Sequence, residues 1–432
     1  MITFKRDVKS VSGVFAVDKT DGELRLIFDG RPLNRIFADP EKVELSGPDA
    51  FHRLQIPDGE DMYIATCDIS AFFHRILVPE WMVQYLALPA VRVGDLPFDV
   101  PGFASDDVIH PCCLTLPMGF SASCLISQEI HRFIVSQCPS LKGAREISLA
   151  DNGLDKVLRY NLFLDDGTFL STDKAEVDVA LEGYIDVMQS HGFPPKWSKV
   201  NWASTKGITL GVEFDGRRGS VYLPPAKMVA LIADTNRMLR SDCASAHEMQ
   251  VLLGRWTWAM MPRREALSVF QAAYAFAATG QSSIRLWSTV ARELRAAVGL
   301  APLLVSDLRR PWAPWAMASD ASLYAQGVTY AAIGPLNAAD IATAARVAAK
   351  ASPPVDDDRA PIGPRPLLTG ARRTSAGVRS YVGRSRWSMH VCLLFLEAPW
   401  LHHAPGGFCC LHCLAVALVQ ASWATLAGST LP

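Results

Sequence analysis

The sequence predicts an α+β protein, with strands in the first half of the chain and helices in the second. Two patterns predict the strands: apolar runs on either side of an Asp-Gly pair within residues 159–170, and an apolar run over residues 62–67. From about residue 224 onward, apolar residues recur at helical spacing. We therefore expect a mixed sheet layer followed by a largely helical part.

Two adjacent aspartates, Asp165 and Asp166, lie at the turn predicted within residues 159–170. An isolated Asp-Asp-Gly is usually a solvated turn, but the apolar flanks favour burial here. A third carboxylate, Asp68, directly follows the strand predicted over residues 62–67. Carboxylates pressed together repel each other and need a cation, and Mg²⁺ prefers hard oxygen ligands. The three aspartates therefore predict a site for two metal ions that acts in phosphoryl transfer.

Capping and periodicity predict the helices. Ser121 is expected to begin a helix that reaches about residue 137, and a second helix is predicted over residues 174–189. Ser245 and Glu248 form a predicted capping box at the start of the helical half. The apolar stripe predicted to bury the first helix consists of Leu125, Ile126, Ile130, Phe133 and Ile134.

Several motifs follow one another in a fixed order along residues 14–300. They are residues 22–34, Asp68 with Phe73, residues 116–120, residues 163–166, Gly192 with Lys199, and Leu210 with Gly211. In this order and spacing the chain resembles the reverse transcriptases, the RNA-directed DNA polymerases, of retrotransposons. The resemblance implies a right-hand polymerase with fingers, a palm of antiparallel sheet plus helices, and a helical thumb.

The same resemblance implies a domain order. The expected domains are partial fingers at 1–60, a palm with part of the fingers at 61–223, thumb or connection helices at 224–300, an incomplete ribonuclease H-like segment at 312–350, and a disordered tail at 351–432. The chain starts inside the expected fingers, which suggests an N-terminal truncation.

Residues 315–322 resemble the first strand of a ribonuclease H domain, where a strand aspartate, here Asp320, joins further carboxylates around metal. The Glu-bearing helix of that fold is not recognisable, so we expect the domain to be incomplete. Residues 359–386 hold seven arginines and no acidic residue among Pro, Gly and Ser. This composition is typical of disordered sequence.

The family resemblance also implies catalytic and metal-binding residues. Asp68, Asp165 and Asp166 would be catalytic and would hold two Mg²⁺ ions, or Mn²⁺ in their place, together with the backbone carbonyl of Ile69. Lys199 matches the lysine that protonates the pyrophosphate leaving group, with the nearby Lys196 as an alternative assignment.

Further residues would bind the incoming nucleotide and the primer. Phe73 would lie under the nucleotide sugar, where a ring clashes with a 2′-hydroxyl and selects deoxynucleotides. Met118 stands where many members have glutamine. The residues implied for nucleotide binding are Lys19, Arg25, Phe73, Met118 and Gly119, and those for the primer grip are Leu210 and Gly211.

Composition sets limits on partners and location. The chain has 432 residues and a formal net charge of −1, which is unusually neutral for a nucleic-acid binder, although charge can be segregated on one face. Ten cysteines without a framework spacing predict reduced thiols. With no cationic, apolar leader at the N-terminus, we expect a cytoplasmic or nuclear protein that is not secreted.

Two patterns near the C-terminus resemble other kinds of site: a membrane span and a zinc site. Residues 408–428 are apolar over about the length of a membrane span, but they contain polar side chains, so we expect no membrane contact. The second pattern is a group of His and Cys residues that could ligate zinc, although the spacing of these residues matches no standard zinc site. The candidate zinc ligands are His402, His403, Cys409, Cys410, His412 and Cys413.

The predicted function is DNA synthesis from a primer, with an RNA or DNA template and deoxynucleoside triphosphates as partners. One alternative is an RNA-templated RNA polymerase, which Phe73 disfavours because such an enzyme needs room for the 2′-hydroxyl. The other is a catalytically inactive, nucleic-acid-binding relic of a retroelement. The sequence leaves the oligomeric state open.

Overall fold

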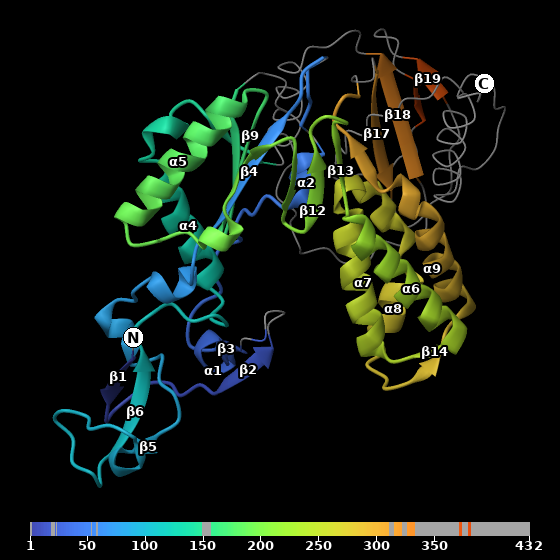
Figure 1. Ribbon diagram of the computed structural model, residues 1–432. Coiled ribbons are helices and arrows are strands. Elements are labelled where there is room, and N and C mark those ends of the chain that lie inside the picture. The colour runs from blue at the N-terminus through green and yellow to red at the C-terminus, as the bar shows by residue number, and fades with distance from the viewer. Residues whose placement is uncertain are drawn as a thin grey trace. The chain divides into compact units, whose positions relative to one another are not determined.

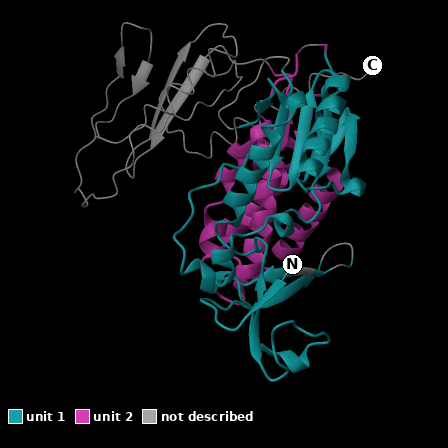
Figure 2. Ribbon diagram, turned by 90° about the vertical axis from the view of Figure 1, so that its left-hand side faces the viewer, with its two compact units in different colours: residues 1–47, 60–148, 156–218 teal, residues 48–59, 149–155, 219–432 magenta. Residues whose placement is uncertain are grey.

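The computed structural model (Figure 1) describes most of the first 310 residues and four later strands. The described residues are 2–18, 22, 24–52, 54–57, 59–148 and 157–310, with the backbones of 315–321, 326–332, 371–373 and 379–381. The chain forms two compact units (Figure 2). The first comprises residues 1–47, 60–148 and 156–218, and the second comprises 48–59, 149–155 and 219–432. No helix in the described ranges is long and apolar enough to cross a membrane.

The first unit is built on a five-stranded sheet in the order β10-β4-β9-β8-β7. Figure 1 labels two of its neighbouring strands, β4 and β9. All neighbours are antiparallel except β7 and β8. The strands are β4 (Tyr63–Asp68), β7 (Arg145–Glu146), β8 (Arg159–Phe163), β9 (Asp166–Ser171) and β10 (Asn201–Ser204). The strands predicted over 62–67 and around the Asp-Gly pair are therefore neighbours in one sheet.

Two long helices, α4 (Ser123–Val135) and α5 (Lys174–Ser190), pack on one face of this sheet (Figure 1). Alternation along the strands turns Ala65, Cys67 and Phe169 toward these helices, and all three are buried in the main core. This burial of one strand face fixes which residues of β4 and β9 remain on the opposite face.

The helix predicted from Ser121 begins at Ser123, and its buried face matches only part of the predicted stripe: Ile126, Ile130 and Ile134 contact the core. Phe133 is 67% exposed, whereas Gln128 and His131 are buried. The predicted apolar stripe is therefore partly wrong. The physical reason is that the main chain of β8 and of the turn after it offers hydrogen-bond partners to these two polar side chains.

The β8–β9 hairpin turns two residues earlier than the Asp-Gly pair at 166–167 predicts. Phe163 pairs with Asp166, so Leu164 and Asp165 form the two-residue turn and the Asp-Gly pair begins β9. Leu164 has a φ of 56°. This left-handed conformation costs an L residue about 1–2 kcal/mol.

A second hairpin covers the other face of the sheet. It consists of β11 (Lys206–Thr209) and β12 (Val212–Asp215), turns at Leu210 and Gly211, and packs β11 against β4. The approach is close, since a Cβ atom on Gly207 would lie 2.8 Å from the Ile64 side chain.

The remaining elements of the first unit are short. A three-stranded sheet has the order β1-β6-β5, and β2 and β3 form a separate ribbon. The strands are β1 (Ile2–Lys5), β2 (Val14–Asp18), β3 (Leu24–Phe28), β5 (Val91–Arg92) and β6 (Val108–Cys113). The helical turns are α1 (Arg31–Asn34), η1 (Phe72–Arg75), α3 (Glu80–Val83), η2 (Val93–Asp95), η3 (Pro139–Leu141) and η4 (Trp197–Lys199).

Two of the sequence motifs, residues 22–34 and residues 116–120, contact each other through the Asn34 side chain and through main chain. Asn34 Nδ2 donates to the Gly119 carbonyl oxygen at 3.0 Å, and the Ser121 amide donates to Asn34 Oδ1 at 2.9 Å. A Cβ atom on Gly30 would lie 1.9 Å from the Gly119 carbonyl oxygen. The segment after β3 is therefore fixed against the loop of residues 116–120.

The second unit is mainly helical. Its helices are α2 (Pro48–Phe51), α6 (Pro225–Ser241), α7 (Ala246–Met260), η5 (Met261–Val269), α8 (Ala272–Ala277), α9 (Ser288–Leu300) and η6 (Ala301–Leu303). The predicted capping box of Ser245 and Glu248 is present at the start of α7. The core surrounds Trp256, whose Nε1 donates to the buried Thr235 Oγ1 at 2.9 Å. The short strands are β13 (Ser220–Tyr222), β14 (Cys243–Ala244), β15 (Ile284–Arg285) and β16 (Val305–Asp307).

The last described strands form a sheet in the order β17-β18-β20-β19. They are β17 (Trp315–Ala321), β18 (Gln326–Ala332), β19 (Ala371–Arg373) and β20 (Arg379–Tyr381). The strand expected to contain Asp320 is β17, where Asp320 pairs with Gly327. Strands β19 and β20 fall within residues 351–432, the tail expected to be disordered; β20 pairs with β18, and β19 pairs with β20. The other expected carboxylates of this segment and the candidate zinc ligands lie outside the described residues.

Replacement of Gly30 by alanine is predicted to destabilise the first unit strongly, because the new methyl group would overlap a main-chain carbonyl that no rotamer change can move. Gly13→Ala is the matched control, since no atom lies within 4 Å of its Cβ position. Thermal denaturation followed by circular dichroism should show a lower melting temperature for Gly30→Ala alone. Equal melting temperatures would contradict the close contact with Gly119.

Candidate active site

Adjacent strands bring Asp68 and Asp166 together at one end of the main sheet. The β4–β9 register pairs Asp68 directly with Asp166, and Thr66 with Thr168. Because strand side chains alternate, these four residues share the face opposite α4 and α5. Directly opposed residues in antiparallel strands have Cβ atoms about 4.5–5.5 Å apart, so the two carboxylates border one common space.

Asp165 is held beside this pair through its main chain. Its carbonyl oxygen accepts a hydrogen bond of 2.9 Å from the amide of Ile69, the residue directly after β4. The negative charge of its side chain contributes to the raised pKa of Asp166. The three predicted aspartates therefore lie around the same end of the sheet.

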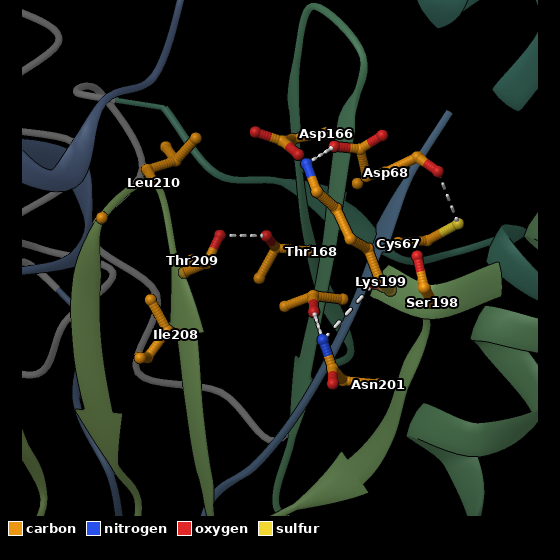
Figure 3. Close-up of a pocket in the computed structure, with 13 residues that line it drawn as sticks. Cys67, Asp68, Asp166, Thr168, Ser198, Lys199, Asn201, Ile208, Thr209 and Leu210 are labelled. Carbon is orange, nitrogen blue, oxygen red and sulfur yellow. Dashed lines mark hydrogen bonds and ion pairs between the residues drawn. The ribbon is translucent and has the colours of Figure 1, made fainter. Parts of the chain in front are cut away.

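Lys199, in η4, supplies a positive charge at this position (Figure 3). Its Nζ forms an ion pair with the Asp68 carboxylate; the Lys199 side chain is 55% exposed and that of Asp68 14%. The Lys196 amide donates to the Asp68 carbonyl oxygen at 2.7 Å, which fixes η4 beside β4. Of the two lysines that the sequence left open, Lys199 contacts Asp68 with its side chain and Lys196 with its main chain.

The electrostatics show an excess of negative charge. Burial, then the neighbouring charges of Asp165 and Asp68, raise the pKa of Asp166 to about 7, and Lys199 opposes this rise. A hydrogen bond to Asp68 raises the pKa of Lys199, so its ammonium stays charged. Burial, reinforced by Asp68 and Asp166, raises the pKa of the Cys67 thiol to about 12, which keeps it neutral. The site therefore favours an additional cation.

A cavity of about 330 Å³ opens beside these groups (Figure 3). Its lining comes from β4, β9, the segment from η4 to β10, and β11 with the turn after it. Asn201 Nδ2 donates to Thr66 Oγ1 at 2.9 Å, and the hydroxyls of Thr168 and Thr209 are 2.6 Å apart. These polar contacts link the elements that form the cavity walls.

The structure places some predicted nucleotide and primer residues at this cavity and others elsewhere. Leu210 and Gly211 line it, together with Asp68, Asp166 and Lys199. The cavity lining does not include the three other described candidates. Phe73 lies in η1, partly buried against the main core; Met118 and Gly119 lie in the loop fixed against the segment after β3. Arg25 is in β3 with its side chain undescribed, and Lys19 lies outside the described residues.

Sequence reasoning missed a group of buried polar residues on α4 and α5, which pack on the face of the sheet opposite Asp68 and Asp166. Gln128 and His131 of α4 and Tyr184 of α5 are buried and bond to the turn or to each other. Burial lowers the pKa of His131 to about 4, so the ring is neutral. Gly167 leaves room for the Tyr184 ring, since a Cβ atom there would lie 3.0 Å from it. The available signal was the spacing of Gln128 and His131, which puts both on one helix face.

The oxygen donors at the sheet end fit a divalent cation chemically, although in the described part of the chain no group of three or more His, Cys, Asp or Glu residues is arranged to hold one. Asp68 and Asp166 present carboxylates to one space, and the charge imbalance on Asp166 is of the kind that a cation relieves. In this structure Lys199 neutralises part of the negative charge through its ion pair with Asp68.

Solved structures with a similar fold are two forms of a foamy viral protease-reverse transcriptase. One is the dRH form in complex with ds DNA, 15% identical with a TM-score of 0.50, over 76% of this chain and 50% of that chain. The other is in complex with an RNA/DNA hybrid, 14% identical with a TM-score of 0.51, over 76% of this chain and 38% of that one. This chain thus spans half or less of their length.

No protein-family model and no curated protein sequence matches the chain. The structural similarities show that the chain has a reverse-transcriptase-like fold, with mixed helix and sheet. The resemblance inferred from the motifs is therefore confirmed at the level of the fold.

Asp166→Asn is predicted to stabilise the metal-free protein at pH 8 but not at pH 4. The pKa of Asp166 is about 7 in the folded protein against 3.8 ordinarily, so the folded state binds more protons between these values and loses stability as pH rises through 7. At about 1.4 kcal/mol per pKa unit, the gain at pH 8 should be about 2–4 kcal/mol.

Urea denaturation with a metal chelator present would measure this difference. The control is Asp186→Asn, which alters an exposed carboxylate on α5 in the same unit. The account of Asp166 would be wrong if its substitution changed stability equally at both pH values.

Proposed function

We propose that this chain is a template-directed DNA polymerase that extends a primer with deoxynucleoside triphosphates, a reverse transcriptase from a retrotransposon. One observation supports this proposal most: Asp68 and Asp166 oppose each other on β4 and β9, with Asp165 in the adjoining turn, in a reverse-transcriptase-like fold. The two motifs that contain these carboxylates and the motif at residues 116–120 all lie in the first unit.

In this proposal the three aspartates, with the Ile69 carbonyl, hold two Mg²⁺ ions, for which Mn²⁺ can substitute. When bound, the ions polarise the α-phosphate and stabilise the attacking and leaving oxygens of an in-line displacement. The carboxylates of Asp68 and Asp166 are held by the paired strands, so little reorganisation is needed at the moment of reaction.

Lys199 is proposed to act on the leaving group. Its Nζ is charged and half exposed at the mouth of the site, so it is available to give a proton to the departing pyrophosphate oxygen. Its present ion pair with Asp68 would be released as that carboxylate takes up its role toward the metal.

The remaining roles follow from the family resemblance. Phe73 would select against the 2′-hydroxyl, Met118 and Gly119 would border the template–nucleotide pair, and Arg25 with Lys19 would contact the triphosphate. Leu210 and Gly211 form the turn between β11 and β12 beside the cavity, which suits a grip on the primer end. In domain terms, the first unit would contain the palm and part of the fingers, and the helices of the second unit the thumb.

Primer extension by the purified full-length chain tests the proposal. With Mg²⁺ and deoxynucleotides on matched RNA and DNA templates, the wild type should extend the primer. Asp68→Asn and Asp166→Asn should each lower the rate at least about 10²-fold, as expected when a group that stabilises the reacting charges is removed. Asp186→Asn should leave the rate within about twofold, in keeping with an exposed residue outside the site.

Extension by both site variants at the wild-type rate would contradict the assigned residues. Extension with ribonucleotides only would support the RNA polymerase alternative, and a folded wild type without any extension would support the inactive relic.

A further inference from the structure

Two side chains of α4 bind the main chain of the turn between β8 and β9 on both sides of one residue. Gln128 Oε1 accepts from the Leu164 amide at 2.9 Å, while its Nε2 donates to the Leu162 carbonyl oxygen at 2.9 Å. His131 Nδ1 lies 2.7 Å from the Leu164 carbonyl oxygen. Both polar groups of Leu164 are therefore bonded to buried side chains from one helix.

The residue bound in this way is the strained one. Leu164 has a φ of 56°, and such a conformation persists only where the surroundings specify it. The next two residues in the chain are Asp165 and Asp166. A turn that relaxed to a negative φ at Leu164 would redirect the chain at the first of these carboxylates.

The bonds of His131 fix its ring in one form and connect it to α5. A carbonyl oxygen can only accept, so His131 Nδ1 carries the proton and its Nε2 accepts from the Tyr184 hydroxyl at 2.9 Å. The Tyr184 ring in turn packs on Phe169 with ring centroids 5.0 Å apart, and on Gly167. The clamp on Leu164 is thus supported by a second helix packed on β9.

We infer that Gln128 and His131 are positioning residues for polymerisation, which act by holding Leu164 in its left-handed conformation and thereby set the direction of Asp165 and Asp166. The inference rests on the proposed function. Neither side chain lines the cavity, so each would act through the turn. It assigns them a role in kcat rather than in nucleotide affinity.

Hydrogen exchange tests the clamp without any need for activity. In the wild type, the Leu164 amide should be protected despite its place in a turn. Gln128→Met, similar in size but without an acceptor oxygen at that position, should speed exchange of this amide at least about tenfold, as expected for loss of one hydrogen bond. Unchanged exchange of Leu164 would overturn the clamp, whether or not the protein extends primers.

Kinetics of paired substitutions test the consequence. His131→Asn keeps an N–H donor near the Nδ1 position, whereas His131→Leu has similar bulk and no donor. We expect kcat of primer extension to fall about 10–100-fold in His131→Leu, with the KM for deoxynucleotide within about threefold, because small misplacement of reacting groups acts on the chemical step. His131→Asn should recover most of the lost kcat.

A matched control separates positioning from general destabilisation. Thr235→Val removes a buried hydrogen-bonded hydroxyl in the second unit. If Thr235→Val lowers kcat as much as His131→Leu at equal folded fraction, the role is structural and the inference fails.

If His131→Leu does not fold, His131→Gln replaces it, because the side-chain N–H donor of glutamine reaches beyond the Nδ1 position. Equal kcat for His131→Asn and His131→Gln would also refute the inference.

Discussion

The register between β4 and β9 is the constraint on which the candidate site depends. Asp68 and Asp166 oppose each other only because Ala65, Cys67 and Phe169 are buried against the helices. A shift of one residue would turn the carboxylates toward the core and expose the apolar residues, at a large cost in burial. The packing of α5 on the sheet therefore fixes the position of the chemistry on its other face.

This arrangement confines repelling charges to a small region. Asp166 responds with a raised pKa, and Lys199 neutralises part of the charge through Asp68. Beside them, a cavity is lined by the sheet and by the β11 end and turn of the β11–β12 hairpin. A site that is negatively charged, partly buried and open to a ligand is suited to bind a cation together with an anionic substrate. That combination is what the proposed phosphoryl transfer requires.

The sequence predicted the local features of this site well. Apolar flanks around Asp165 and Asp166, and the apolar run before Asp68, were sufficient to predict the strands at whose ends these carboxylates lie. Ser245 with Glu248 was sufficient to predict the start of α7. The turn lies two residues before the position that the Asp-Gly pair predicts, and Gly167 instead leaves room for the Tyr184 ring.

The polar residues of α4 could not be assigned from the sequence. A glutamine and a histidine on a helix are ordinarily solvent-facing, and their burial depends on main-chain partners in β8 and its turn, about thirty positions away in the sequence.

The central claim is that Asp68 and Asp166 together bind a divalent cation. Binding of Mn²⁺ to the full-length protein, followed by electron paramagnetic resonance with a deoxynucleoside triphosphate present, tests this claim most directly. The account predicts that Asp68→Asn and Asp166→Asn each weaken Mn²⁺ binding while Asp186→Asn does not. Equal Mn²⁺ binding by all of these variants would contradict it.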